Sequence, residues 1–373
     1  MSGPVVDALR ARTVEIPMAE PVETAGGVMS TTPVVLIDVR DSEGLCGRTY
    51  LRTYSSLAVR ALAVLLEDLA ELVVGRPVVP EELPGRAPHT LRLLGSGGLV
   101  GFALAGLDMA LWDLRAQAAE RSLADLLGAT VDKVPAYASL RSRDPRRAAE
   151  EAEKRAREGF RAVKVKLGGQ PLEADRGLVQ AVRSGAGPNV AIMADYNQSL
   201  SVAEALSRAQ ELDALELAWI EEPTTATDMA GHARISEALS TPVQLGENLE
   251  APQEVRRSIG ESASDHLMLD AMKIGGVTGW MQACAMAGGA GKKVSSHAFP
   301  EYSVHLLAAT PTAHWLEHLD HLAPIREAPL DVVDGYVCVP RTHGAGLRWD
   351  ERAVSLLLDQ PTCWVASWSQ RGR

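Results

Sequence analysis

The sequence predicts an α/β protein in which a parallel β/α barrel follows a separate α+β unit. Asp195, Glu221 and Glu247 are spaced 26 residues apart, and each lies at the end of a short apolar run. That spacing fits one strand plus one helix, and buried parallel strands read as continuous apolar runs. The 373 residues, 46% of them hydrophobic, also exceed the roughly 250 that a barrel alone needs.

The same period continues on both sides of these three runs. Apolar residues three or four apart predict helices between the runs, as in 146–158 and 202–212. Alternation of this kind favours a parallel barrel over an open sheet, so the strand ends should meet at one mouth. The eight expected strands are 133–139, 162–166, 190–195, 217–221, 243–247, 266–270, 293–297 and 314–317.

The regions outside the barrel predict a capping structure. Between residues 18 and 31 lies a segment rich in Gly and Pro that we expect to be a long, mobile loop, able to act as a lid. After residue 320 the alternation stops, and we expect the tail to pack back on the first unit. The expected cap contains a hairpin of 34–39 and 49–51 and helices at 57–72 and 101–119. The expected domains are 1–130 (cap), 131–320 (barrel) and 321–373 (tail).

Composition excludes several classes of protein. A net charge of −11 with scattered basic residues argues against a nucleic-acid partner. Cys46, Cys284, Cys338 and Cys363 lack metal or redox spacing, and we expect no secretion signal. The uncharged stretch 274–291 holds six glycines and falls within the barrel repeat, so we expect a buried helix there and no membrane span. We therefore expect a cytoplasmic homo-oligomer with no membrane partner.

Three carboxylates at one mouth predict a metal site. Asp195, Glu221 and Glu247 would repel one another unless a cation lay between them, and an all-oxygen ligand set suits Mg²⁺. Each acid could instead cap a helix or form an exposed salt bridge. Because strand alternation sends neighbours to opposite faces, we expect Glu222 to point away from the site.

Lys164 and Lys166 lie two apart on one strand, so they share a face. With Val163, Val165 and Leu167 packing against helices, both lysines should point inward. At about 6–7 Å apart, each would lower the pKa of the other and favour a general base near neutral pH. Nearby carboxylates would instead raise the pKa of either lysine. A lone lysine on a strand could also simply extend its amine into solvent.

His297 and Asp270 end consecutive strands and should be neighbours. A carboxylate on one ring nitrogen fixes the tautomer and raises the basicity of the other nitrogen. A histidine satisfied by a backbone carbonyl is the structural alternative, and Glu317 could be a helix or loop contact.

The chain resembles the enolase superfamily and, within it, the mandelate racemase subgroup. The resemblance implies a (β/α)7β TIM-like barrel with an α+β capping domain whose two loops close over the substrate. The stretches that carry it are AGLDMALWD at 105–113, AVKVK at 162–166, DYNQS at 195–199, WIEEP at 219–223, GEN at 246–248, DAMKIGGVTGW at 270–280, SSH at 295–297 and TPTAHWLE at 310–317.

The resemblance also implies roles for residues. Asp195, Glu221 and Glu247 would bind Mg²⁺, Lys166 would be the base on one face of the substrate carbon, and His297, oriented by Asp270, the base on the other. Lys164 and Ser139 would contact the carboxylate of the substrate, Glu317 would donate a proton or a short hydrogen bond to it, and Asn197 would hold the 2-hydroxyl.

We expect this arrangement to remove the proton next to a carboxylate, first for racemisation of a 2-hydroxy acid. Dehydration of an acid sugar is the alternative, since His297 could expel a 3-hydroxyl as an acid. A catalytically silent binding or assembly protein is a third, remote reading.

Substrate choice should depend on the rim of the pocket. Val22, Met29, Tyr54 and Leu319 suit an apolar pocket, whereas Arg52, Gly26 and Ala298 stand where the resemblance implies larger apolar residues, and Leu140 replaces a polar one. Arg52 either pairs with Glu23 in solvent or turns inward to bind a polar or anionic tail. We favour the second reading because a phenyl pocket has no use for a guanidinium. A polar or acidic 2-hydroxy acid, or a sugar acid, therefore competes with mandelate.

Overall fold

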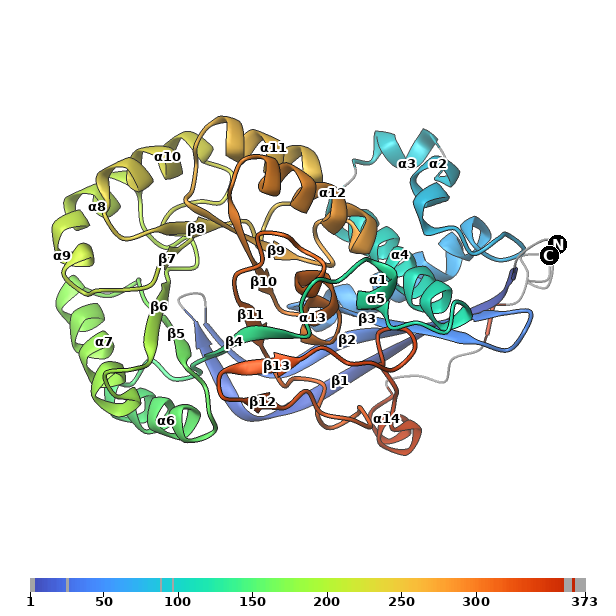
Figure 1. Ribbon diagram of the computed structural model, residues 1–373, viewed down its shortest axis with the longest axis horizontal. Coiled ribbons are helices and arrows are strands. Elements are labelled where there is room, and N and C mark those ends of the chain that lie inside the picture. The colour runs from blue at the N-terminus through green and yellow to red at the C-terminus, as the bar shows by residue number, and fades with distance from the viewer. Residues whose placement is uncertain (1–3, 25–26, 88, 96, 359–363, 366–373) are drawn as a thin grey trace.

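The computed structural model describes residues 4–24, 27–87, 89–95, 97–358 and 364–365. A barrel of strands ringed by helices packs beside a smaller α+β unit (Figure 1). In these ranges no helix is both long and apolar enough to cross a membrane.

Among the described residues, eight parallel strands form the barrel and follow the chain order from β4 to β10. The last strand, β11, pairs in parallel with the first, and the N–H of Ser296 donates to the carbonyl of Trp315 (2.9 Å) across the gap between β10 and β11. The closed (β/α)7β barrel is therefore confirmed. Its strands are β4 (Lys133–Ser139), β5 (Ala162–Lys166), β6 (Ala191–Asp195), β7 (Ile220–Glu221), β8 (Val243–Leu245), β9 (His266–Asp270), β10 (Lys293–His297) and β11 (Leu316–His318).

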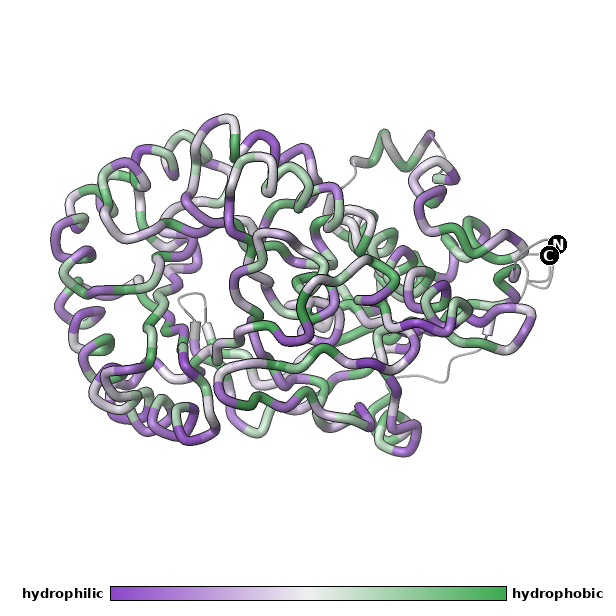
Figure 2. The backbone as a smooth tube through the Cα atoms, viewed as in Figure 1, coloured by the Kyte–Doolittle hydropathy of each residue, from purple (hydrophilic) through white to green (hydrophobic). Residues whose placement is uncertain are grey.

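Helices cover the outside of the barrel and bury small or branched residues against it. Val163 and Val165 of β5, and Leu167 just after it, are fully buried in that layer, which leaves Lys164 and Lys166 on the inner face as expected. Hydrophilic residues recur around the outer ring of helices (Figure 2). These helices are α6 (Pro145–Arg157), α7 (Leu172–Ala186), α8 (Val202–Ser207), α9 (Ala209–Asp213), α10 (Met229–Ala238), α11 (Pro252–Gly260), α12 (Gly276–Gly289) and α13 (Pro300–Ala308).

Some barrel elements differ from the sequence expectation. The expected helix 202–212 is two short helices, and the run 217–221 contributes only the two residues of β7. Glu247 lies two residues beyond β8, after Gly246. Gly246 has φ +134°, and a Cβ there would meet the carbonyl oxygen of Met268 at 2.5 Å, so this turn requires glycine. The uncharged stretch 274–291 contains the helix α12, which buries one face along its length, with Val277, Trp280, Ala283, Cys284 and Ala287 among the buried residues.

The cap is an antiparallel sheet of β1 (Val6–Thr24), β2 (Gly27–Asp41) and β3 (Cys46–Arg52) with helices packed on it. The expected loop at 18–31 is wrong in its described part, because β1 and β2 stay paired as far as Thr24 and Gly27. Pro17 and Pro21 do not break the hairpin because the ladder is irregular between Pro17 and Val22. The helices are α1 (Ser56–Asp68), α2 (Leu83–Arg86), α3 (His89–Leu93), α4 (Gly98–Ala118) and α5 (Leu123–Leu126), with 3-10 turns at Leu69–Leu72 and Pro80–Glu82.

The hairpin of β1 and β2 reaches across to the barrel mouth (Figure 1). The N–H of Glu23 donates to the carbonyl of Arg141 (2.8 Å), and the Glu23 carboxylate accepts from the N–H of Arg143 (2.8 Å). The paired ends of β1 and β2 therefore lie at the mouth where a loop was expected, and Val22 and Met29 line it.

The tail contacts both units. β12 (Val332–Val333) and β13 (Tyr336–Cys338) extend the sheet at β4, while α14 (Glu351–Leu357) lies against β1. Arg12 of β1 bonds Glu351 (2.5 Å). The later part of the tail therefore packs on the cap as expected, whereas β12 and β13 pack on the barrel. Cys46, Cys284 and Cys338 are free thiols, and Cys363 lies outside the described residues, as does Gly26.

Candidate active site

A cavity of about 380 Å³ opens at the carboxyl ends of the barrel strands, beneath the cap. Both units supply its walls. The barrel contributes Ala138, Ser139, Leu140, Lys164, Lys166, Asp195, Asn197, Glu247, His297, Glu317 and Leu319, and the cap contributes Val22, Met29, Arg52 and Tyr54.

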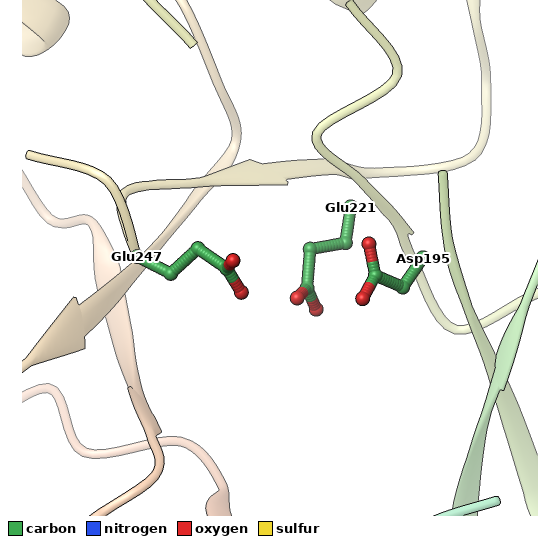
Figure 3. Close-up of side chains that lie close together, drawn as sticks. All are labelled: Asp195, Glu221 and Glu247. Carbon is green, nitrogen blue, oxygen red and sulfur yellow. The ribbon is translucent and has the colours of Figure 1, made fainter. Parts of the chain in front are cut away.

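Asp195, Glu221 and Glu247 converge as the spacing predicts. They come from three successive strand ends, and one oxygen from each lies within 4.8 Å of the others (Figure 3). Burial raises the pKa of Glu221 well above its ordinary value, although Lys164 opposes this. Such close, buried carboxylates need a cation, and the all-oxygen donor set fits Mg²⁺.

Neighbouring donors fix these carboxylates. Asp195 accepts bonds from the backbone and side-chain N–H groups of Asn197 (2.8 and 2.9 Å). Asn197 adopts φ +44°, a left-handed conformation that asparagine tolerates. Glu221 accepts a bond from Nε1 of Trp219 (3.1 Å) and one from Lys164 (2.7 Å). Asp195 and Glu221 are thus held in place by the chain itself.

Lys164 is locked among carboxylates. Its Nζ lies 2.7 Å from Glu221 and 3.2 Å from Glu317. Burial would lower its pKa, but these two carboxylates raise it well above the ordinary value. The expected mutual lowering of the lysine pKa values is therefore wrong for Lys164, since the carboxylates outweigh a second lysine. Lys164 is a fixed positive charge.

Lys166 has more freedom. Its Nζ donates to Oδ2 of Asp195 and to Oδ1 of Asn197, both at 3.0 Å, and its side chain keeps 16% of its surface exposed to the cavity. The amine therefore lies at the Asp195 side of the carboxylate cluster and faces the space that a substrate would fill.

His297 and Asp270 form the expected pair. Nδ1 of His297 lies 2.7 Å from Oδ2 of Asp270, and the other Asp270 oxygen accepts bonds from the N–H groups of Met272 and Lys273. Nε2 of His297 lies 3.5 Å from Glu247. Burial lowers the pKa of His297, but Glu247 and the Asp270 bond raise it further, to a value above its ordinary one.

Glu317 is held as an anion. Its two oxygens accept bonds from Oγ of Ser139 (2.5 Å) and from the N–H of Ala298 (2.9 Å). Burial raises its pKa, but Lys164 and His297 lower it well below its ordinary range. Lys164 and His297 therefore favour the ionised form of Glu317, and Ser139 bonds it. The expected proton or short hydrogen bond from Glu317 to a substrate carboxylate stays a prediction.

The residues that were expected to form the rim of the pocket do line the cavity. Val22, Met29, Tyr54 and Leu319 line the cavity, and so does Arg52, which is only 7% exposed. The alternative of an exposed Arg52–Glu23 pair is wrong, because Glu23 bonds the backbone of the 141–143 loop.

Sequence reasoning missed two polar groups that line this mouth, Asn248 and Lys273, and placed Glu222 on the opposite face by strand alternation. Glu222 is buried with φ +38°, and its carboxylate accepts a bond from Asn248 (2.7 Å), which in turn accepts one from Lys273 (2.7 Å). Strand alternation did not apply to Glu222 because β7 ends at Glu221. Lys273 could have been noticed as a lysine three residues past a strand end.

Models of two families match the chain. Residues 8–128 match the mandelate racemase/muconate lactonizing enzyme N-terminal domain, and residues 147–353, more than half of the chain, match the enolase C-terminal domain-like family. The chain belongs to the enolase superfamily. Within this superfamily it falls in the mandelate racemase subgroup, as the motifs at the strand ends indicated.

Several proteins of known sequence or structure resemble this enolase-superfamily enzyme along most of their length. The structure of an enolase from Bradyrhizobium complexed with magnesium and mandelic acid is 40% identical (TM-score 0.90, 96% of this chain and 100% of that one). An enolase from alphaproteobacterium BAL199 with bound magnesium is 37% identical (TM-score 0.92, 95% and 99%). L-talarate/galactarate dehydratase of Salmonella typhimurium is 28% identical over 364 residues (94% and 91%). Cycloisomerases and an epimerase also match, so these relatives include both isomerases and dehydratases.

Proposed function

We propose that this enzyme removes the proton next to the carboxylate of a 2-hydroxy acid, with Mg²⁺, and returns a proton to the opposite face. One observation carries the proposal. Lys166 contacts Asp195 and His297 lies beside Glu247, so the two candidate bases stand at the two ends of the carboxylate cluster. A carbon held between them could lose a proton to one and regain it from the other.

Magnesium suits this site on electrostatic grounds. Asp195, Glu221 and Glu247 would hold the ion, because three carboxylates with oxygens within 4.8 Å of one another repel unless a cation lies among them. Relatives are crystallised with magnesium. Bound there, Mg²⁺ would supply positive charge for the second negative charge that develops on the substrate carboxylate when the proton leaves.

The chain supplies the remaining chemistry. Lys164, fixed between Glu221 and Glu317, would add a second positive charge near the substrate carboxylate. Asp270 would keep Nδ1 of His297 engaged so that Nε2 faces the substrate and can give or take a proton. A substrate carboxylate beside Glu317 would oppose its negative charge and allow Glu317 to hold a proton at that moment.

The substrate class has support from two relatives. Mandelic acid, bound to the Bradyrhizobium protein, and galactarate, the substrate in the name of the Salmonella dehydratase, are both 2-hydroxy acids. The 2-hydroxy acid unit is therefore the shared chemistry that we assign to this site.

Dehydration is the second candidate. The raised pKa of His297 suits an acid that would protonate a departing 3-hydroxyl, and a dehydratase is among the relatives. The same proton abstraction by Lys166 would begin either reaction.

Incubation of the Mg²⁺-loaded enzyme in D₂O with mandelate, aldonates and aldarates tests the proposal. Deuterium at C2 with inversion supports racemisation or epimerisation, whereas a 2-keto-3-deoxy acid supports dehydration. No exchange with any member of a broad panel would leave a catalytically silent binding protein as the better account. A Lys166→Met/His297→Asn double variant is the control for background exchange.

A further inference from the structure

We propose that Arg52 and Lys273 form an anion subsite at the cap end of the pocket, which selects hydroxy acids bearing a second carboxylate. The inference rests on the proposed function, because it assumes that the first carboxylate binds among the barrel strand ends. It adds the substrate class, a hydroxy-diacid.

Arg52 carries a buried charge that lacks a partner. It ends β3, lines the cavity and is 7% exposed. Across the described ranges it forms no hydrogen bond or ion pair, and its guanidinium lies over the Tyr54 ring, 4.9 Å from Cζ to the centroid. A buried, unpaired guanidinium is costly, and a ligand anion would remove that cost.

Other cations around the cavity have partners. Of the six lysines and arginines that line it, four have a carboxylate within 4.0 Å, namely Arg141, Arg155, Lys164 and Lys166. The two without one, within the described part of the chain, are Arg52 and Lys273.

Lys273 lies beside the same ring as Arg52. Its Nζ is 5.2 Å from the Tyr54 centroid and donates to Oδ1 of Asn248, and the residue is 9% exposed. Two like charges around one aromatic ring oppose each other unless an anion lies near both. The cap and the barrel thus each contribute one cation to this end of the cavity.

Nearby acids of the protein are already engaged. Asp320, which lines the cavity, bonds Arg326 (2.5 Å), and Glu23 bonds the backbone of Arg143. Glu317 is taken by Lys164 and Ser139 at the other end. Glu222 and Glu247 lie near enough to interact with the Lys273 charge, Glu222 through their shared partner Asn248, but within the described residues neither lies within 4.0 Å of the Lys273 amine. An external anion could therefore still bind both Arg52 and Lys273 directly.

A carboxylate fits this subsite better than an aromatic tail. The planar donors of a guanidinium can bind both oxygens of a carboxylate. A phenyl ring could contact Arg52 only by stacking on the guanidinium, which uses none of its N–H donors. It would also leave both charges without a counterion and further from water.

The test compares diacids with monoacids of equal length. For the Mg²⁺-loaded enzyme, kcat/KM is measured for galactarate and L-glucarate and for the matching aldonates, in which CH₂OH replaces one carboxylate, with mandelate and tartrate alongside. We expect Arg52→Gln to reduce the preference for diacids on the order of 10- to 100-fold, and Arg52→Lys to restore part of it. Arg157→Gln, which removes an exposed charge on α6, should leave the preference unchanged.

Binding measurements separate this inference from the proposed function. Calorimetry with galactarate and galactonate on the Lys166→Met/His297→Asn background reports affinity without turnover. Tighter binding of the diacid that depends on Arg52 supports the subsite even if no substrate reacts. Equal affinity for the two acids, or an equal loss for both in Arg52→Gln, overturns the subsite and leaves proton abstraction standing.

Discussion

Nδ1 of His297 lies 2.7 Å from Oδ2 of Asp270, and this contact leaves Nε2 as the ring nitrogen near Glu247. The backbone N–H groups of Met272 and Lys273 hold the second Asp270 oxygen, so the orientation of the pair is built into the turn after β9. Asp270 is therefore the counterion at Nδ1 of the imidazolium, and Nε2 faces the space that a substrate would fill.

Asp270→Asn should weaken this base while preserving the fold. The amide cannot stabilise an imidazolium, so we expect C2–H exchange on the His297 side to fall on the order of 100-fold or more. Exchange on the Lys166 side should change much less. The measurement is deuterium uptake from each enantiomer in D₂O. An equal loss for both enantiomers in a folded variant would mean that Asp270 serves the whole site and not His297.

Replacing either base should remove proton exchange for one enantiomer only. His297→Asn should abolish inversion yet still exchange the proton of one enantiomer through Lys166, and Lys166→Met should give the complementary pattern. The reason is that each base lies at its own end of the carboxylate cluster. Proton NMR of each enantiomer in D₂O measures this directly. Loss of both exchanges in both variants would point to a single base.

Most of the barrel could be predicted from sequence because its strands are apolar runs closed by a polar residue. β4, β5, β9 and β10 begin and end where the runs do, and their closing residues include Lys166, Asp270 and His297. The carboxyl ends of neighbouring parallel strands lie at the same mouth of the barrel, so the spacing of Asp195 and Glu221 was enough to predict that they lie close together.

Other features depend on contacts that no local pattern contains. β1 continues to Thr24 because Val22, Glu23 and Thr24 pair with β2, in spite of Pro17 and Pro21 just before them. Glu222 is buried because the chain turns immediately after β7, where alternation no longer holds. The charge on Lys164 follows from Glu221 and Glu317, whose distances only the closed barrel sets.

Activity should depend on a divalent cation. Chelation should abolish C2–H exchange and added Mg²⁺ should restore it, because Asp195, Glu221 and Glu247 cannot share a site unneutralised. Binding to the folded state alone should also raise Tm as Mg²⁺ increases. Glu247→Gln should blunt both effects, whereas Glu153→Gln on the exposed face of α6 should not. Full turnover by metal-free enzyme would contradict the assignment.

Asp108 should make the stability of the cap–barrel contact depend on pH. It lies in α4 and accepts bonds from the N–H and hydroxyl of Thr278 in α12 (3.0 and 2.5 Å). Burial raises its pKa from 3.8 to about 7, although the Thr278 bonds oppose the shift. The folded state therefore holds this proton more tightly than the unfolded state does. Its contribution to stability is complete below about pH 4 and is lost as pH rises through about 7.

Asp108→Asn removes that titration. The free energy of unfolding of the wild type should therefore fall relative to that of the variant as pH rises from 5.5 to 7.5. The slope has an upper limit of about 1.4 kcal/mol per pH unit for one proton. Urea unfolding at several pH values measures it, with Glu153→Gln as the control for an exposed carboxylate. A difference that stays constant over this range would mean that Asp108 is already ionised in the folded protein, and that the bonds from Thr278 outweigh its burial.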